Sequence, residues 1–206
     1  MSTVKIKKEH PQKAELIEMR KKTAKPLLWI GIVSIVMLFA GLTSAYVVRA
    51  DNGNWLVFHL PPIAIISTAI IVASSLTMLI AQFSIRKDKQ NMATLFLFIT
   101  FVLGLAFTYT QYAGWKELTA QGIYFLGKYS NASGSFLYLI ALMHLFHLFG
   151  GLFALLITLT KSIRKRYSSH DHLGIELAAI YWHFLDVLWI YLFLFLFFSL
   201  NLYPIF

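Results

Sequence analysis

The sequence of 206 residues contains no cysteine. This absence excludes disulfide bonds, thiolate-bound iron–sulfur clusters, thiolate-bound haem and cysteine nucleophiles. The chain is also poor in charge, because only 13% of its residues are Asp, Glu, Lys or Arg. No internal repeat and no linker rich in proline or glycine divides it. We therefore expect one folded unit without a separate soluble catalytic domain.

Hydrophobic residues make up 58% of the chain, and they occur in long blocks rather than in short alternating runs. A helix that crosses about 30 Å of hydrocarbon needs about 20 apolar residues. The sequence therefore predicts an all-α fold, a polytopic integral membrane bundle of five transmembrane helices. The expected spans cover about residues 27–48, 61–83, 92–113, 136–160 and 176–200.

The basic residues are distributed unevenly between the two ends of the expected bundle. Eight precede residue 27, three lie within 86–89 and four within 161–166, whereas the other connections hold only Arg49, Lys116 and Lys128. Since Lys and Arg are retained on the cytoplasmic side, this split predicts the N-terminus inside and the C-terminus outside. Residues 1–26 are then a basic cytoplasmic arm, and residues 27–206 form the five-helix transmembrane domain.

The arm resembles neither a signal peptide nor a nucleic-acid-binding segment. It has no apolar core and no small-residue cleavage site, so we expect residues 27–48 to act as the first inserted helix. Its basic residues alternate with Glu9, Glu15 and Glu18, and no recognition motif accompanies them. The net charge of +9 is explained by topology, and attraction to the membrane surface is a simpler role than nucleic-acid binding.

Three histidines and one acid, His144, His147, His183 and Asp186, lie well inside the expected spans, away from their ends. An acid near the centre of a spanning helix costs about 2.5–3.5 kcal/mol on insertion scales, so it normally faces the bundle interior and has a partner. His144 and His147 share one face of the fourth span, as His183 and Asp186 do on the fifth. Because His147 and Asp186 come to similar depths in antiparallel helices, we hypothesise a buried polar cluster of His147, His183 and Asp186.

Three roles are open to these residues: structural hydrogen bonding, cofactor ligation and proton handling. Two histidines three apart on one helix cannot bracket a haem iron, although His147 and His183 together could. The first three spans carry no Asp, Glu, Lys, Arg or His in their apolar cores, which argues against a continuous proton path. We favour the structural role and assign no catalytic, cofactor-binding or metal-binding residue. The loop residues His170, Asp171 and His172 are typical of a solvated loop rather than of a metal site.

Several small or hydroxylated residues suggest helix contacts. Gly41 and Ala45 are four apart on the first span, and Gly150 and Gly151 follow the histidine pair on the fourth. Such residues let helices approach closely. The hydroxyls of the second span, within 74–77, can bond to their own helix or to a neighbour. The tripeptide at 131–133 fits a glycosylation sequon, which is common by chance.

Taken in order, the spans resemble subunit III of the haem-copper respiratory oxidases. The stretch 181–193 is similar to that family's Tyr-Trp-His-Phe-x-Asp-x-x-Trp signature, and the segment 144–151 to its His-x-x-His-x-x-x-Gly helix. Residues 37–46 match an early helix, and the resemblance covers about residues 27–200. Further family positions, besides the histidines and the acid, are Tyr181, Trp182, Trp189, Gln111, Trp115, Ser74, Ser75, Thr77 and Gly151.

The resemblance implies a short five-helix form of the family, equivalent to the last five helices of seven-helix members. Two positions depart from the family pattern. Ile35 stands where many members have a buried glutamate, and Gly114 where many have an acid. A role that depends on the first-span carboxylate is therefore not carried over to this chain.

By resemblance, the protein is an auxiliary subunit without a redox centre in a cytochrome c oxidase that reduces oxygen and pumps protons. Haem and copper are expected in the partner subunits, and phospholipids in a cleft of this chain. The expected partners are the catalytic subunit I, the other oxidase subunits, membrane lipids and a larger respiratory supercomplex. The expected location is the bacterial cytoplasmic membrane.

Two groups of alternatives remain. Within the resemblance, the chain could serve a quinol oxidase or a nitric-oxide reductase. From a different class, it could be an independent proton channel or transporter. It shows no repeated halves and no pair of helices broken by glycine or proline, which argues against a transporter with a midplane substrate site.

Overall fold

The computed structural model describes the backbone of residues 3–51, 55–56, 60–127, 130–168 and 171–202. Within these ranges it describes the side chains from Glu18 to Leu200, apart from those of Arg20 and Lys21. The loop histidine His170 lies outside the described residues, so its predicted place in a solvated loop stays a prediction.

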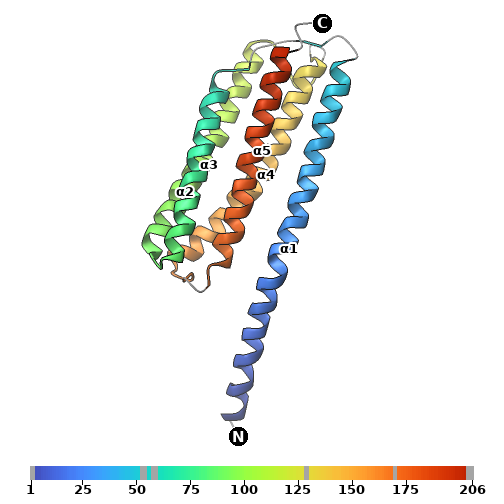
Figure 1. Cartoon of the computed structure of the whole chain (residues 1–206). Helices are drawn as coiled ribbons and strands as arrows, with labels where there is room; N and C mark the ends of the chain where they lie inside the picture. The colour runs from blue at the N-terminus through green and yellow to red at the C-terminus, as the bar shows by residue number, and fades with distance from the viewer. Residues whose placement is uncertain (1–2, 52–54, 57–59, 128–129, 169–170, 203–206) are drawn as a thin grey trace.

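The described chain consists of five α-helices that run alternately up and down (Figure 1). They are α1 (Thr3–Ala50), α2 (Ile63–Arg86), α3 (Gln90–Ala120), α4 (Ala132–Ile163) and α5 (Leu173–Leu202). Each contains a segment long and apolar enough to cross a membrane, and no strand occurs among the described residues. The predicted all-α membrane fold with five spans is confirmed.

The helices extend beyond the apolar runs that predicted them. α3 continues to Ala120, and α1 runs without interruption from Thr3, so the backbone of the basic arm belongs to the same helix as the first span. The physical reason is that backbone hydrogen bonding, rather than hydrophobicity, sets where a helix ends. At the start of α4 the side chain of Asn131 accepts a 3.0 Å hydrogen bond from the backbone N–H of Ser133. The sequon asparagine therefore acts as a helix N-cap.

Four of the helices, α2 to α5, pack into a bundle, and α1 lies along its side (Figure 1). α2 and α3 form a tight hairpin, whose turn places Asp88 at a φ of 59°. α1 contacts α4 and α5. Gly41 and Ala45 of α1 are exposed, and nothing lies within 4 Å of a Cβ built at Gly41. The expectation that this pair supports helix packing is wrong within this chain, because the pair faces away from the bundle.

Trp182 of α5 fills the centre of the bundle and is fully buried. Two glycines make room for it. A Cβ at Gly104 of α3 would lie 2.7 Å from the Trp182 ring, and a Cβ at Gly151 of α4 would lie 2.8 Å from Leu185 and 3.3 Å from Trp182. Gly150, by contrast, meets only the Tyr181 hydroxyl at 3.7 Å, an ordinary contact. The close approach predicted for the glycine pair therefore depends on Gly151.

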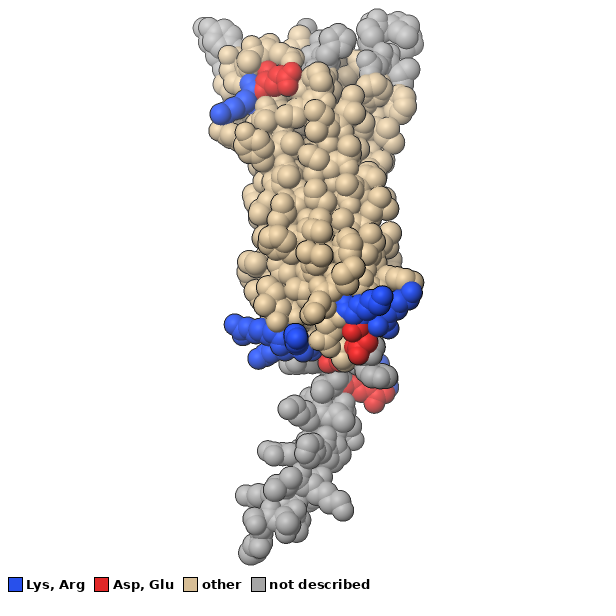
Figure 2. Space-filling model, turned by 90° about the vertical axis from the view of Figure 1, so that its left-hand side faces the viewer, with Lys and Arg blue, Asp and Glu red and all other residues tan. Residues whose placement is uncertain are grey.

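Most of the described basic residues gather at one end of the molecule (Figure 2). It is the end past which the ribbon of α1 extends (Figure 1). This end carries the α2–α3 turn and the α4–α5 connection, with seven Lys and Arg residues within 86–89 and 161–166. We call it the basic end. The opposite end, where the chain passes from α1 to α2 and from α3 to α4, has few basic residues among those described.

Candidate functional site

The main polar contact inside the bundle joins α2 to α5. The indole N–H of Trp182 donates a 2.7 Å hydrogen bond to the hydroxyl of Ser74. On the next residue of each helix, the Ser75 hydroxyl lies 2.6 Å from Nδ1 of His183. Further along, the indole of Trp189 donates to the hydroxyl of Thr68 at 3.2 Å. These bonds pair polar groups that would have no water partner in a membrane.

Asp186 lies one helical turn after His183 and is only 2% exposed. Its side chain faces the interior of the bundle, as predicted for an acid inside a span. Neither carboxyl oxygen has a hydrogen-bond partner of good geometry among the described residues.

His144 is the most enclosed of the three histidines in the spans, with an exposure of 1%. Its ring lies among aromatic rings, with centroid distances of 5.2 Å to Trp189 and 6.1 Å to Phe107. Neither of its ring nitrogens has a hydrogen-bond partner among the described residues. His144 is thus packed as an aromatic core residue.

His147 bonds within its own helix. Its Nδ1 lies 2.7 Å from the carbonyl oxygen of Met143, and its ring centroid lies 5.7 Å from that of Phe39 on α1. The Tyr181 hydroxyl donates to the His147 carbonyl at 3.2 Å. The described hydrogen bonds and ring contacts join His147 to neither His183 nor Asp186. The predicted cluster of these three residues between α4 and α5 stays a prediction.

Sequence reasoning did not identify Ser75 as the partner of His183. The available signal was the pair Ser74 and Ser75, two adjacent hydroxyls in an apolar helix. Periodicity alone shows that they can bond to a neighbouring helix but does not say which one. That choice depends on how the helices are placed around the bundle.

The remaining family positions lie on the same helices. Thr77 bonds to the hydroxyl of Thr100 at 2.8 Å and so links α2 to α3. Gln111, which is 9% exposed, lines a small cavity of about 50 Å³ together with Trp115 and Trp189.

The two departures from the family pattern have local surroundings that suit the residues present. A Cβ at Gly114 would lie only 3.2 Å from Ile63, so the α2–α3 contact leaves little room for an acidic side chain. Ile35 packs against the apolar cluster that contains Phe39 and Leu192.

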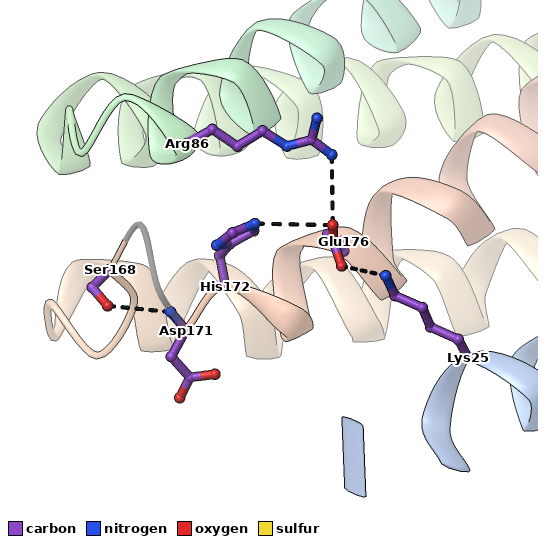
Figure 3. Close-up of polar contacts among 6 residues, drawn as sticks. All are labelled: Lys25, Arg86, Ser168, Asp171, His172 and Glu176. Atoms are coloured by element: carbon purple, nitrogen blue, oxygen red, sulfur yellow. Dashed lines mark hydrogen bonds and ion pairs between the residues drawn. The ribbon is translucent and has the colours of Figure 1, made fainter. Parts of the chain in front are cut away.

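A second polar site lies at the basic end, where Glu176 begins the apolar part of α5 (Figure 3). Its carboxylate lies 2.7 Å from Nζ of Lys25 on α1 and 3.5 Å from the guanidinium of Arg86 on α2. His172, one turn earlier, lies 3.9 Å away. We call this group the Glu176 ion-pair node. It connects α1 to α2, which otherwise lie apart.

No group of three or more metal-ligating side chains occurs among the described residues. In the α4–α5 connection the side chain of Asp171 points away from His172, and its backbone N–H bonds to Ser168 (Figure 3). The described polar residues are thus arranged as contacts between helices. The fold and these sites define the class of protein. It is an integral membrane bundle of five helices, in which indole and imidazole groups form hydrogen bonds at the core.

A family model described as "Cytochrome c oxidase subunit III" matches residues 20–200. The chain therefore belongs to the cytochrome c oxidase subunit III family, and the resemblance read from the motifs is confirmed.

Individual relatives agree with the family match. The chain is similar to cytochrome c oxidase subunit 3 of Mus musculus, at 31% identity over 79% of this chain and 64% of the mouse protein. The subunit 3 of Anopheles gambiae is 34% identical over 64% of this chain and 48% of its own length. A bacterial relative from Nocardia farcinica, described as a probable cytochrome c oxidase subunit 3, is 32% identical over 81% of this chain and 82% of its own. The chain thus spans about half to two thirds of the length of these two animal relatives.

Proposed function

We propose that this chain is the auxiliary, non-redox subunit III of a terminal haem-copper oxidase. The observation that carries the proposal is the family match over residues 20–200, which includes all five spans. The interior supports it, since Trp182 bonds to Ser74 and His183 bonds to Ser75, as expected of a structural subunit. The histidines and Asp186 then serve the stability of the bundle and, through it, the durability of the complex.

The chemistry belongs to the partners in this proposal. Haem and copper reside in the catalytic subunit, which takes electrons from cytochrome c, reduces oxygen and pumps protons. This chain packs against that subunit, binds phospholipids and supports proton uptake by its partner. The same assembly can join a larger respiratory supercomplex.

The proposed membrane is the bacterial cytoplasmic membrane, with the basic end inside. The uneven distribution of Lys and Arg supports this orientation, because positively charged connections are retained in the cytoplasm (Figure 2). The C-terminus then lies outside, since five spans place the two ends of the chain on opposite sides.

Purification in mild detergent through a tag on this chain tests the proposal. We expect haem absorbance and oxygen consumption to copurify with the tag, and reduced cytochrome c to sustain the oxygen consumption. Supplying a quinol in place of cytochrome c identifies the donor. A colourless, homogeneous monomer would contradict the assignment to an oxidase.

A further inference from the structure

A small cavity lies among α2, α3, α4 and α5, toward the end of the bundle opposite the basic end. Its lining includes Pro61 just before α2, Leu118 in the last turn of α3 and Leu137 near the start of α4. Its volume is about 50 Å³. This is far below the roughly 300 Å³ of the smaller ligand pockets, yet it exceeds the about 10–15 Å³ that one water molecule requires. The cavity therefore suits a very small molecule.

Gln111 is the amide side chain in this mostly apolar lining, and we call the space the Gln111 cavity. The residue is only 9% exposed, and it lies nine residues, about 14 Å, before the end of α3 at Ala120. Among the described residues, no hydrogen bond is made by its amide. An amide carries two N–H donors and one carbonyl acceptor, and it is costly to bury without partners. Gln111 therefore requires a hydrogen-bond partner inside the cavity.

Two hydroxyl groups in the lining can accept hydrogen bonds. Ser67 of α2 is fully buried, and its hydroxyl donates to the carbonyl oxygen of Ala64 at 2.8 Å. The hydroxyl of Thr110 donates to the carbonyl oxygen of Phe107 at 2.7 Å. Each hydroxyl has one proton, which is already used, but its oxygen retains the capacity to accept. The cavity thus combines acceptors on two helices with the amide of Gln111.

Two other residues in the lining do not serve the amide. The indole N–H of Trp189 already donates to the hydroxyl of Thr68 at 3.2 Å. Gly114, one turn after Gln111, has no side chain that could bond to it or occupy the cavity. A ligand that bonds to Gln111 must therefore be small and polar, and it must donate as well as accept.

We propose that the Gln111 cavity is a water-binding site. One or more water molecules accept from the N–H groups of Gln111 and donate to the hydroxyl oxygens of Ser67 and Thr110. Water matches these groups, because a buried water molecule typically makes about three hydrogen bonds. The site links α2 to α3 through the bound water. The proposal goes beyond the proposed function, because it concerns the interior of this chain and requires no haem-containing partner.

An apolar occupant, such as a lipid methyl group or a dissolved gas, is the alternative. It would suit the leucines and aromatic rings of the lining, but it would leave the Gln111 amide buried without a partner. Cavities that stay dry are those lined by apolar groups. The polar groups of this cavity therefore favour water.

Hydroxyl-radical footprinting of the full-length chain, in the complex with which it purifies, tests the proposal. An X-ray pulse produces radicals from bound water, and these oxidise the side chains next to it. Trp189 lines the cavity and is only 6% exposed, whereas the fully buried Trp182 does not line it. We expect oxidation of Trp189 and none of Trp182. A wild-type chain in which Trp189 stays unoxidised overturns the proposal.

The Gln111→Leu variant removes the amide and nearly preserves the size of the side chain. We expect the oxidation of Trp189 to fall several-fold, because the bound water has lost its acceptor and donor on α3. Undiminished oxidation would show that the radicals come from bulk solvent, and it would overturn the site.

Thr110→Val tests the site without changing Gln111, and Thr108→Val is its matched control. The Thr108 hydroxyl also donates to a carbonyl of its own helix, that of Gly104 at 3.0 Å, but Thr108 does not line the cavity. We expect less oxidation of Trp189 in Thr110→Val and no change in Thr108→Val. Equal effects of both variants would overturn the assignment of Thr110 to the site.

These measurements remain decisive if Gln111→Leu fails to fold, because the wild-type chain and the threonine variants test the site independently. Failure of haem to copurify would contradict the oxidase assignment and would leave the footprint of Trp189 unaffected.

Discussion

At the scale of single residues, the interior of this protein depends on a few side chains that both fill space and form hydrogen bonds. Trp182 fills the space between α3 and α4 and also bonds to Ser74 on α2. Its position is permitted by Gly104 and Gly151, which have no side chain to obstruct the ring. A side chain at either glycine would clash with its neighbours, and replacement of Ser74 or Trp182 would break the hydrogen bond.

Gly151→Ala should destabilise the bundle by about 1–3 kcal/mol, because the new methyl group would overpack Leu185 and Trp182. Gly150→Ala is the matched control, since its methyl group meets only the Tyr181 hydroxyl at an ordinary distance. Thermal loss of helical signal in detergent measures both variants. Equal stability of the two would contradict the close contact at Gly151.

Trp182→Phe should cost about 1 kcal/mol or more, because it leaves the Ser74 hydroxyl without its indole partner and removes part of a buried ring. In the double variant with Ser74→Ala, part of this cost should be recovered, since both polar partners are then absent. A double-mutant cycle on thermal stability provides the coupling energy. Strict additivity would show that the hydrogen bond contributes nothing.

At the scale of helices, α1 is attached differently from the other four. It contacts α4 and α5 along an apolar surface, and the Glu176 ion-pair node connects it to α2 at the basic end. The sequence predicted a spanning helix here because its apolar run is long enough. It did not predict the peripheral position, because lipid-facing and core-facing residues are equally apolar in a membrane protein.

Lys25→Met should loosen the basic end of α1, because it removes the 2.7 Å contact to Glu176. Lys22→Met is the matched control, since Lys22 pairs with Glu18 on the exposed side of the same helix. The chain has no cysteine of its own, so spin labels at introduced cysteines 23 and 87 report the separation of α1 and α2. We expect a broader distance distribution in Lys25→Met. An unchanged distribution would show that the apolar surface alone positions α1.

The α2–α5 contact illustrates what sequence reasoning can and cannot provide at this scale. The 3.6-residue period places His183 and Asp186 on one face of α5, and the cost of a buried acid predicts an inward orientation. Both inferences agree with the burial of Asp186. The identity of the partner of His183, the hydroxyl of Ser75, depends on the packing of two helices far apart in the chain, which no local pattern encodes.

At the scale of the whole molecule, the distribution of charge is the most informative global property. Lys and Arg are concentrated at one end, and the membrane-spanning part between the two ends is almost free of charge (Figure 2). The sequence alone was sufficient to predict this, because the number of spans and the charge of each connection follow directly from it. The orientation itself stays a prediction.

Labelling of intact cells with a membrane-impermeant thiol reagent tests the orientation. Lys116→Cys, at the end opposite the arm, should react in intact cells. Arg164→Cys, at the basic end, should react only after the membrane is made permeable. The reverse pattern would place the basic end outside and contradict the positive-inside prediction.

Two of the hydrogen bonds between α2 and α5, those of Ser74 and Ser75, have a consequence for biosynthesis. Each joins residues 108 positions apart, so the hydroxyls of Ser74 and Ser75 are made long before Trp182 and His183 leave the ribosome. In the interval, serine hydroxyls can bond to carbonyls of their own helix. The arrival of the fifth helix then releases those temporary bonds and closes the core. The bundle is therefore completed when the fifth helix inserts, late in synthesis, and not when the earlier helices form.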